Sequence, residues 1–316
     1  AITAPDGGVT NHHFYNRGDI SWKKGLVYRI EDPAGKTWRC WQKNEPWIGV
    51  TTGNDPKNPY AGAEYRQLAG AGVVAAATFV YDKNGNMMKK LEYSLGSAPN
   101  DNTPSCSVSG TPIRRTENRY WSPPGSSPSN PALASDSVDD SQDLANAYWT
   151  HAAHAKRDSL LESRIYAGNE SQASNAKALT QFTYDDPNTT GNVLNEFRWN
   201  SSMASSAPAV ATTNTTLTTG NAVVRSRSYV SGQSGLLDTE TDERGTTTKY
   251  VYGLVSSSPT GGNCPSGYTN LYPTSITVAN NDANVKQEHG YRYDCATGAL
   301  THTIFASNQN TRTGYS

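Results

Sequence analysis

The sequence predicts a mainly β fold, an antiparallel strip of β-hairpins with one short helix. Hydrophobic residues make up only 35% of the 316 residues, and the mean hydropathy is -0.68, so a thick core is not expected. Charged residues are also few, at 17%. The polarity therefore comes from Ser, Thr, Asn, Gln and Gly, which suit hydrogen-bonded sheets and turns.

A repeated unit gives the third reason for this fold. An aromatic-rich strand ends in Tyr-Asp, crosses a turn that contains Gly, and continues as a second alternating strand, which is typical of a hairpin. Four segments carry the unit: residues 79–93, 182–194, 228–237 and 291–300. A further unit with an Asp-x-x-Gly turn covers residues 237–252, and weaker versions surround Asp32-Pro33-Ala34-Gly35 and Tyr166-Ala167-Gly168-Asn169.

The turn residues of these units have a physical reason. An Asp side chain accepts hydrogen bonds from backbone amides two residues on, and Gly adopts a positive φ without strain. We therefore expect structural turns at four places: Asp82 with Gly85, Asp185 with Gly191, Asp242 with Gly245, and Asp294 with Gly298.

Two segments interrupt the β pattern. Residues 122–131 form a Pro/Ser-rich loop, and the following stretch is acidic early and basic late, which suits a helix dipole. One short helix is expected near Leu144 to Ala155. Ser201 to Thr219 has few large apolar residues and is expected to be a long surface loop or an edge strand.

Net charge and apolar runs argue against two classes of partner, nucleic acids and membranes. With 27 basic and 28 acidic residues the formal net charge is -1, so a nucleic acid is not expected as a partner. The longest apolar run, residues 73–80, is far shorter than the roughly 20 residues that span a bilayer, so no membrane span is expected in this segment.

The Tyr-Asp units resemble the YD repeats of the RHS family, whose signature is Tyr-Asp, a short Gly turn and a hydrophobic strand. The resemblance extends from about Gly25 to the end, and the order of its units is similar to that of large acidobacterial-type RHS proteins. Residues 26–32 and 271–274 belong to that order. The turn at residues 185–191 is longer than the signature, and Tyr229-Val230 lacks the Asp.

The resemblance implies a β-sheet strip that coils into a hollow shell, as in bacterial RHS, toxin-complex cocoon and teneurin proteins. The chain would be a fragment of a longer one, because about 300 residues form only part of such a shell. The expected organisation is an N-terminal extension (1–24), a first YD-repeat segment (25–121), the loop and short helix (122–160), and a second YD-repeat segment (161–316), truncated at its C-terminus.

Four cysteines, Cys40, Cys106, Cys264 and Cys295, have no C-x-x-C spacing of a zinc or redox site. Two disulfides in an oxidising compartment are expected, with three possible connectivities; four buried free thiols are the alternative. Sequential pairing, Cys40 with Cys106 and Cys264 with Cys295, keeps each bridge within one half of the chain. Cys264 with Cys295 would anchor a Gly-rich loop to the turn of the last hairpin.

Candidate reactive groups are sparse. No nucleophile elbow, oriented Cys–His pair or H-E-x-x-H motif is present, so no catalytic residue, metal ligand or cofactor is predicted. His151 and His154 would share a helix face but lack further ligands at a diagnostic spacing. The tryptophans, four of which lie between Trp22 and Trp47, favour ordinary sheet packing over a stacking platform for sugars.

The leading hypothesis is therefore a non-catalytic structural shell segment of a secreted or cell-surface bacterial protein that encloses or displays cargo. The alternative is a self-assembling extracellular filament, or a module that binds carbohydrate or a surface. The expected partners are the remainder of the same polypeptide shell or further copies of the chain, with carbohydrate as a further possibility.

Overall fold

The computed structural model describes residues 2–3, 7–16, 21–44, 58–81, 85–95, 97–120, 159–185, 191–210, 215–231, 235–252, 272–293 and 299–306. These residues form seventeen β-strands and two short 3-10 helices, η1 (Ser21–Lys23) and η3 (Ala173–Asn175), so the predicted mainly β, antiparallel fold is confirmed. The helix expected near Leu144 to Ala155 and the Pro/Ser loop lie outside the described residues.

Two compact units make up the chain. Unit 1 comprises residues 1–182 and 198–222, and unit 2 comprises residues 183–197 and 223–316. The four segments expected from the sequence were defined by repeat patterns, whereas the two units are defined by their internal contacts. The boundaries of the four segments therefore stay a prediction.

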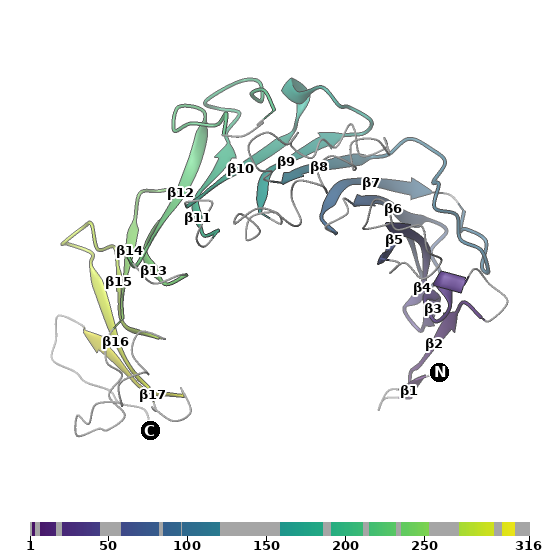
Figure 1. The fold of residues 1–316 in the computed structure, drawn as a ribbon, viewed down its shortest axis with the longest axis horizontal. Helices are drawn as coiled ribbons and strands as arrows, with labels where there is room; N and C mark the ends of the chain where they lie inside the picture. Colours follow the sequence, from purple (N-terminus) through teal and green to yellow (C-terminus); the bar gives the residue numbers. More distant parts are fainter. Residues whose placement is uncertain are drawn as a thin grey trace, which may run out of the picture. The chain divides into compact units, whose positions relative to one another are not determined.

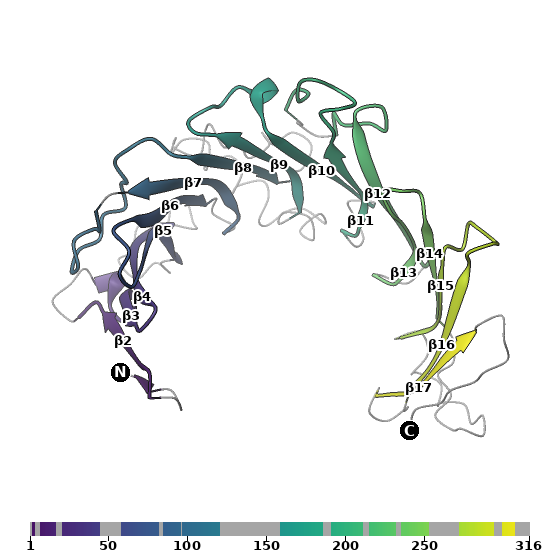
Figure 2. The ribbon, with the colours of Figure 1, turned by 180° about the vertical axis from the view of Figure 1, so that it is seen from behind.

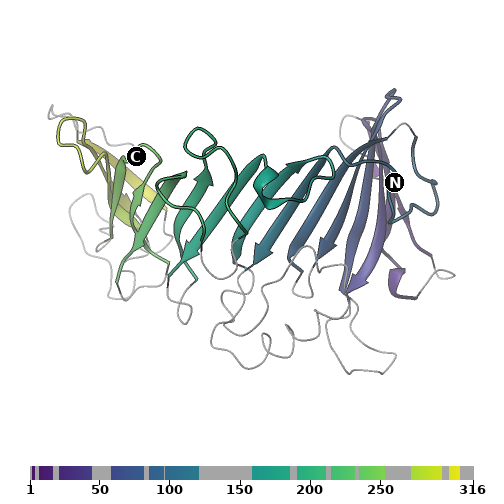
Figure 3. The same ribbon diagram turned by 90° about the horizontal axis from the view of Figure 1, so that it is seen from above.

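In unit 1, neighbouring strands along the chain lie side by side and pair antiparallel (Figures 1 and 3). The strands are β1 (Ile2–Thr3), β2 (Val9–Phe14), β3 (Val27–Asp32), β4 (Gly35–Asn44), β5 (Asn58–Leu68), β6 (Val74–Tyr81), β7 (Met87–Leu95), β8 (Arg114–Tyr120), β9 (Leu160–Ala167) and most of β10 (Ala178–Tyr184). Strand β2 pairs with β3, so part of the expected N-terminal extension is a strand of this sheet.

Unit 2 contains most of β11 (Val193–Trp199) and β12 (Ala222–Tyr229), and the whole of β13 (Leu237–Thr241), β14 (Thr247–Tyr252), β15 (Pro273–Val278), β16 (Gln287–Tyr293) and β17 (Leu300–Ala306). From β12 onward each strand pairs antiparallel with the next, green to yellow in Figure 2. The strands expected around the turns of residues 79–93, 228–237, 237–252 and 291–300 are all present.

The principal hydrophobic cluster lies on one face of the unit 1 sheet. Its register runs from Trp38 through Tyr65 and Ala76 to Tyr93, one residue from each of β4 to β7. Directly paired residues share a face, so this row is continuous across four strands. The loop between β7 and β8, residues 97–112, supplies Cys106 and Val108 to the same cluster. A single-layer sheet thus gains a core by folding its own loop onto one face.

Two glycines show why the turns need this residue type. Gly245 follows Asp242 and has a φ of +82°, with open space where a Cβ would stand. Gly35 has a φ of +147°, and a Cβ there would lie 2.0 Å from the carbonyl oxygen of Gln67 on β5. Gly85 and Gly191 also have positive φ, as the turn pattern predicts, whereas Gly298 lies outside the described residues.

We expect Gly35→Ala to lower the free energy of unfolding by about 3 kcal/mol, because it adds backbone strain and a clash with β5. Gly245→Ala adds strain alone and should cost about 1 kcal/mol. Urea unfolding followed by tryptophan fluorescence measures both. Equal losses in the two variants would contradict the close approach of β4 and β5 at Gly35.

Candidate functional site

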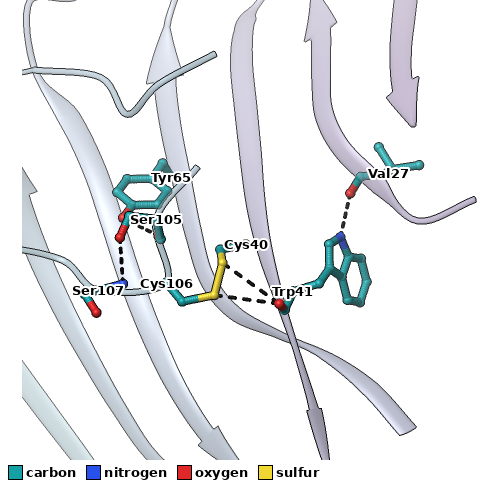
Figure 4. Close-up of a disulfide and its surroundings, with 7 residues drawn as sticks. All are labelled: Val27, Cys40, Trp41, Tyr65, Ser105, Cys106 and Ser107. Atoms are coloured by element: carbon teal, nitrogen blue, oxygen red, sulfur yellow. Dashed lines mark hydrogen bonds between the residues drawn. A yellow bond between two sulfur atoms is a disulfide. The ribbon is translucent and has the colours of Figure 1, made fainter. Parts of the chain in front are cut away.

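A disulfide fixes the loop of residues 97–112 over the sheet. Cys40 on β4 is joined to Cys106 on the loop, with 5.1 Å between the two Cα atoms (Figure 4). This is one of the two bridges expected from the sequence. The other expected pair, Cys264 with Cys295, lies outside the described residues.

Polar contacts attach the same loop at two further points. The Tyr65 hydroxyl donates to the carbonyl oxygen of Ser105 at 2.7 Å (Figure 4), and Trp38 Nε1 donates to the Asp101 carboxylate at 2.9 Å. Trp38 is only 1% exposed. It therefore packs in the core, as favoured from the sequence, and offers no stacking surface to a sugar.

The aspartates of the turns act as local caps. Asp242 Oδ1 accepts from the amides of Arg244 at 2.9 Å and Thr246 at 2.8 Å. Asp185 Oδ1 accepts from the amide of Asn192 at 3.0 Å, which closes the lengthened turn. These carboxylates are occupied in holding turns. Asp82 and Asp294 lie outside the described residues.

Rows of charged side chains cross the same face of the unit 1 sheet beyond the hydrophobic cluster. Lys89 on β7 is opposite Glu117 on β8, which is opposite Arg164 on β9. In the next row, Arg119 is opposite Glu162 and Glu162 is opposite Gln181 on β10. Opposite charges face each other across strands, an arrangement that stabilises antiparallel pairing.

Arg164 is the anchor of this region, and it is only 2% exposed. Its guanidinium forms a two-pronged pair with Glu162, in which Nη2 lies 3.1 Å from Oε2. Nη1 donates to the Ala173 carbonyl at 2.9 Å, and Nη2 donates to the carbonyls of Pro208 and Ala209. One buried side chain therefore fastens two loops, residues 168–177 and 200–217, to β9.

The second of these loops corresponds to the Ser/Thr/Ala-rich stretch. Its described residues form no strand, so the expectation of a loop is confirmed over an edge strand there. It is not wholly at the surface, because Leu217 is 2% exposed and Ala207 is 4% exposed. The side chain of buried Gln181 binds the backbone amides of Thr216 and Leu217 at 2.8 and 2.9 Å.

A pocket of about 450 Å³ lies among these charged rows. Six charged side chains line it: Lys89, Arg115, Glu117, Arg119, Glu162 and Arg164. Tyr166 also lines it, and burial together with the negative charge of Glu117 raises the pKa of this tyrosine to about 12. Its hydroxyl therefore stays protonated at neutral pH. Sequence patterns missed this pocket, since its residues come from three strands, β7 to β9, and from two loops, and are brought together by the strand register.

The described part of the chain was searched for groups of side chains that could bind a metal or act as a nucleophile with its base. No group of three or more His, Cys, Asp or Glu residues there could hold a metal ion. His13 lies against Arg29 and Glu31 rather than beside a nucleophile, and His151 and His154 lie outside the described residues. Among the described residues, no helix has the length and apolar character needed to cross a membrane.

Comparison with known proteins gave no matching family model and no matching curated protein. Among solved structures, a TcdB2–TccC3 chain is 12% identical with a TM-score of 0.40, covering 90% of this chain and 18% of its own. The Tc holotoxin pore of Photorhabdus luminescens is 14% identical, with a TM-score of 0.32, and the alignment covers 94% of this chain and 14% of that one. A porin-like protein from Bacteroides uniformis is 10% identical with a TM-score of 0.26, and the alignment covers 77% of this chain and 88% of that one. The chain thus spans less than a fifth of the first two structures.

Replacing Cys40 and Cys106 together by Ser should lower the free energy of unfolding by about 4 kcal/mol on the chain-entropy model, because the bridge closes a separation of 66 residues. Denaturant unfolding checks this, with the reduced wild-type chain as the control. Stability equal to that of the oxidised chain would contradict it. Peptide mapping of the unreduced protein also tests Cys264 with Cys295, which stays a prediction.

Arg164→Met should destabilise the chain by about 3–5 kcal/mol, because it removes a buried ion pair with Glu162 and leaves three loop carbonyls without their donor. Hydrogen exchange should then speed up in residues 168–177 and 200–217. The matched control is Arg66→Met on β5, an exposed arginine of the same sheet, with an expected change within about 0.5 kcal/mol. Similar losses of unfolding free energy in both variants would contradict the anchoring role of Arg164.

Proposed function

We propose that this chain is a non-catalytic structural segment of a shell of the RHS/YD-repeat kind, in a secreted or cell-surface protein that encloses or displays cargo. One observation carries the proposal: within each unit, strands pair with their neighbours along the chain in a single antiparallel layer. A layer of this kind extends by adding hairpins and serves as a wall.

The use of polar residues supports the same role. The turn aspartates cap backbone amides, Arg164 and Gln181 hold loops, and opposite charges pair between strands. Among the described residues, these charged and amide side chains thus hold turns, loops and neighbouring strands in place. The partners of such a wall are the rest of the same polypeptide or further copies of the chain.

The bridge between Cys40 and Cys106 supports a compartment outside the cytoplasm. Disulfides persist in oxidising surroundings such as the periplasm or the cell exterior, and are rare in the cytosol. A wall that buries few side chains also benefits from a covalent fastening. This supports placement of the protein outside the cytoplasm.

Electron microscopy of the full-length parent protein tests the proposal. A hollow, closed particle is the expected result, since a strip of hairpins must curve and close to enclose cargo. Fibres whose length grows with concentration would favour the filament alternative. A compact particle without a lumen would contradict both.

A further inference from the structure

The loop between β7 and β8 is fastened to the sheet in two different ways. Near its middle, the disulfide holds Cys106 and the Tyr65 hydroxyl holds Ser105 (Figure 4). Neither of these contacts changes in acid, because a disulfide does not titrate and a tyrosine hydroxyl stays protonated. The earlier part of the loop, residues 97–103, is here named the strap. Most of its side chains are exposed, and Asp101 fastens it to β3 and β4.

The contacts of Asp101 depend on its negative charge. Its carboxylate accepts from Trp38 Nε1 at 2.9 Å, and Trp38 is buried. Arg29 Nη1 lies 3.4 Å from Asp101 Oδ2 and also donates to the Asp101 carbonyl at 3.1 Å. Lys36 Nζ lies 3.7 Å from the same Oδ2. Two cations of the sheet thus hold one carboxylate of the strap above a buried indole.

Glu31 shares both cations with Asp101. Its Oε1 lies 3.1 Å from Arg29 Nε and 3.2 Å from Lys36 Nζ. His13 on β2 completes the cluster, with Nε2 3.6 Å from Glu31 Oε2 and 3.3 Å from Arg29 Nη2. The three strands under the strap therefore present His13, Arg29, Glu31 and Lys36 to Asp101. With a neutral imidazole, two cations face two carboxylates and the cluster is balanced.

Acid removes this balance. Burial alone would raise the pKa of Glu31, but the hydrogen bond from Lys36 and the charge of Arg29 outweigh it and lower the pKa below its ordinary value. A lowered carboxyl pKa means that the ionised form stabilises the folded arrangement, and that this stabilisation is lost as the pH falls through the lowered pKa. Once both carboxylates and His13 are protonated, three cations face no anion.

We propose that the strap is an acid-sensitive latch, which lifts from the sheet when the cluster around Asp101 is protonated and uncovers Trp38. The strap stays attached at both ends, by β7 before it and by Ser105 and Cys106 after it. Lifting is therefore local and reverses when neutral pH is restored. The device presents an apolar ring to the surroundings in acid alone, and it is independent of whether the sheet forms a shell.

Hydroxyl-radical footprinting of the intact chain, read by mass spectrometry at pH 7 and pH 3, tests the proposal. The measured quantity is the oxidation rate of Trp38 relative to that of Tyr166, which is equally buried, on β9. We expect Asp101→Asn to raise it about fivefold at pH 7, because the amide keeps an acceptor for the indole but loses both ion pairs. The wild-type chain should show at least the same rise at pH 3.

Glu64→Gln is the matched control. Glu64 pairs with Arg39 in a similarly exposed ion pair of the same sheet, and it points to the face opposite its buried neighbour Tyr65. This variant should change the Trp38 rate by less than about twofold. An unchanged Trp38 rate in Asp101→Asn, equal rises in the two variants, or a wild-type rate that is the same at pH 7 and pH 3 would each overturn the proposal. If circular dichroism shows that the sheet unfolds at pH 3, the comparison of variants at pH 7 decides alone.

Discussion

A sheet one layer thick has no second layer to bury its faces, and this constraint shapes the rest of the molecule. Among the described residues, every buried hydrophobic side chain except Ala279 belongs to unit 1. In unit 1, three long loops fold back onto the strands and contribute Ala176, Ala207 and Leu217 to the buried side chains. In this unit the loops therefore supply part of the missing layer.

Covering a sheet with loops creates its own difficulty, since loop backbone carries polar groups that need partners once buried. Arg164 and Gln181 supply these partners in complementary ways. The guanidinium of Arg164 donates to loop carbonyls, and the side-chain amide oxygen of Gln181 accepts from loop amides. At the other end of unit 1, the disulfide and the Tyr65 hydroxyl hold a loop that has fewer such contacts. Polar side chains on the covered face are thus part of the packing.

The sequence predicted the parts of the fold that depend on local pattern. Alternation and the Asp–Gly turns identified the hairpins around residues 85 and 245, because both signals lie within a few residues of one another. Strand β2 was missed as part of the sheet, since Val9–Phe14 lacks the Tyr-Asp signature and becomes a strand by pairing with β3. The pocket was missed for a related reason: Lys89, Glu117 and Arg164 are far apart in sequence and meet only through register.

Next-neighbour pairing also separates the roles of the two faces along each strand. On β7, Lys89 enters the pocket, whereas Lys90 pairs with Glu92 on the opposite face, so a shift of one residue would exchange them. Such a shift would place Lys90 opposite Glu117 and carry Leu91 and Tyr93 out of the hydrophobic cluster. The charged rows and the apolar rows therefore specify the same register. This agreement lets a chain with few hydrophobic residues choose one pairing among many similar hairpins.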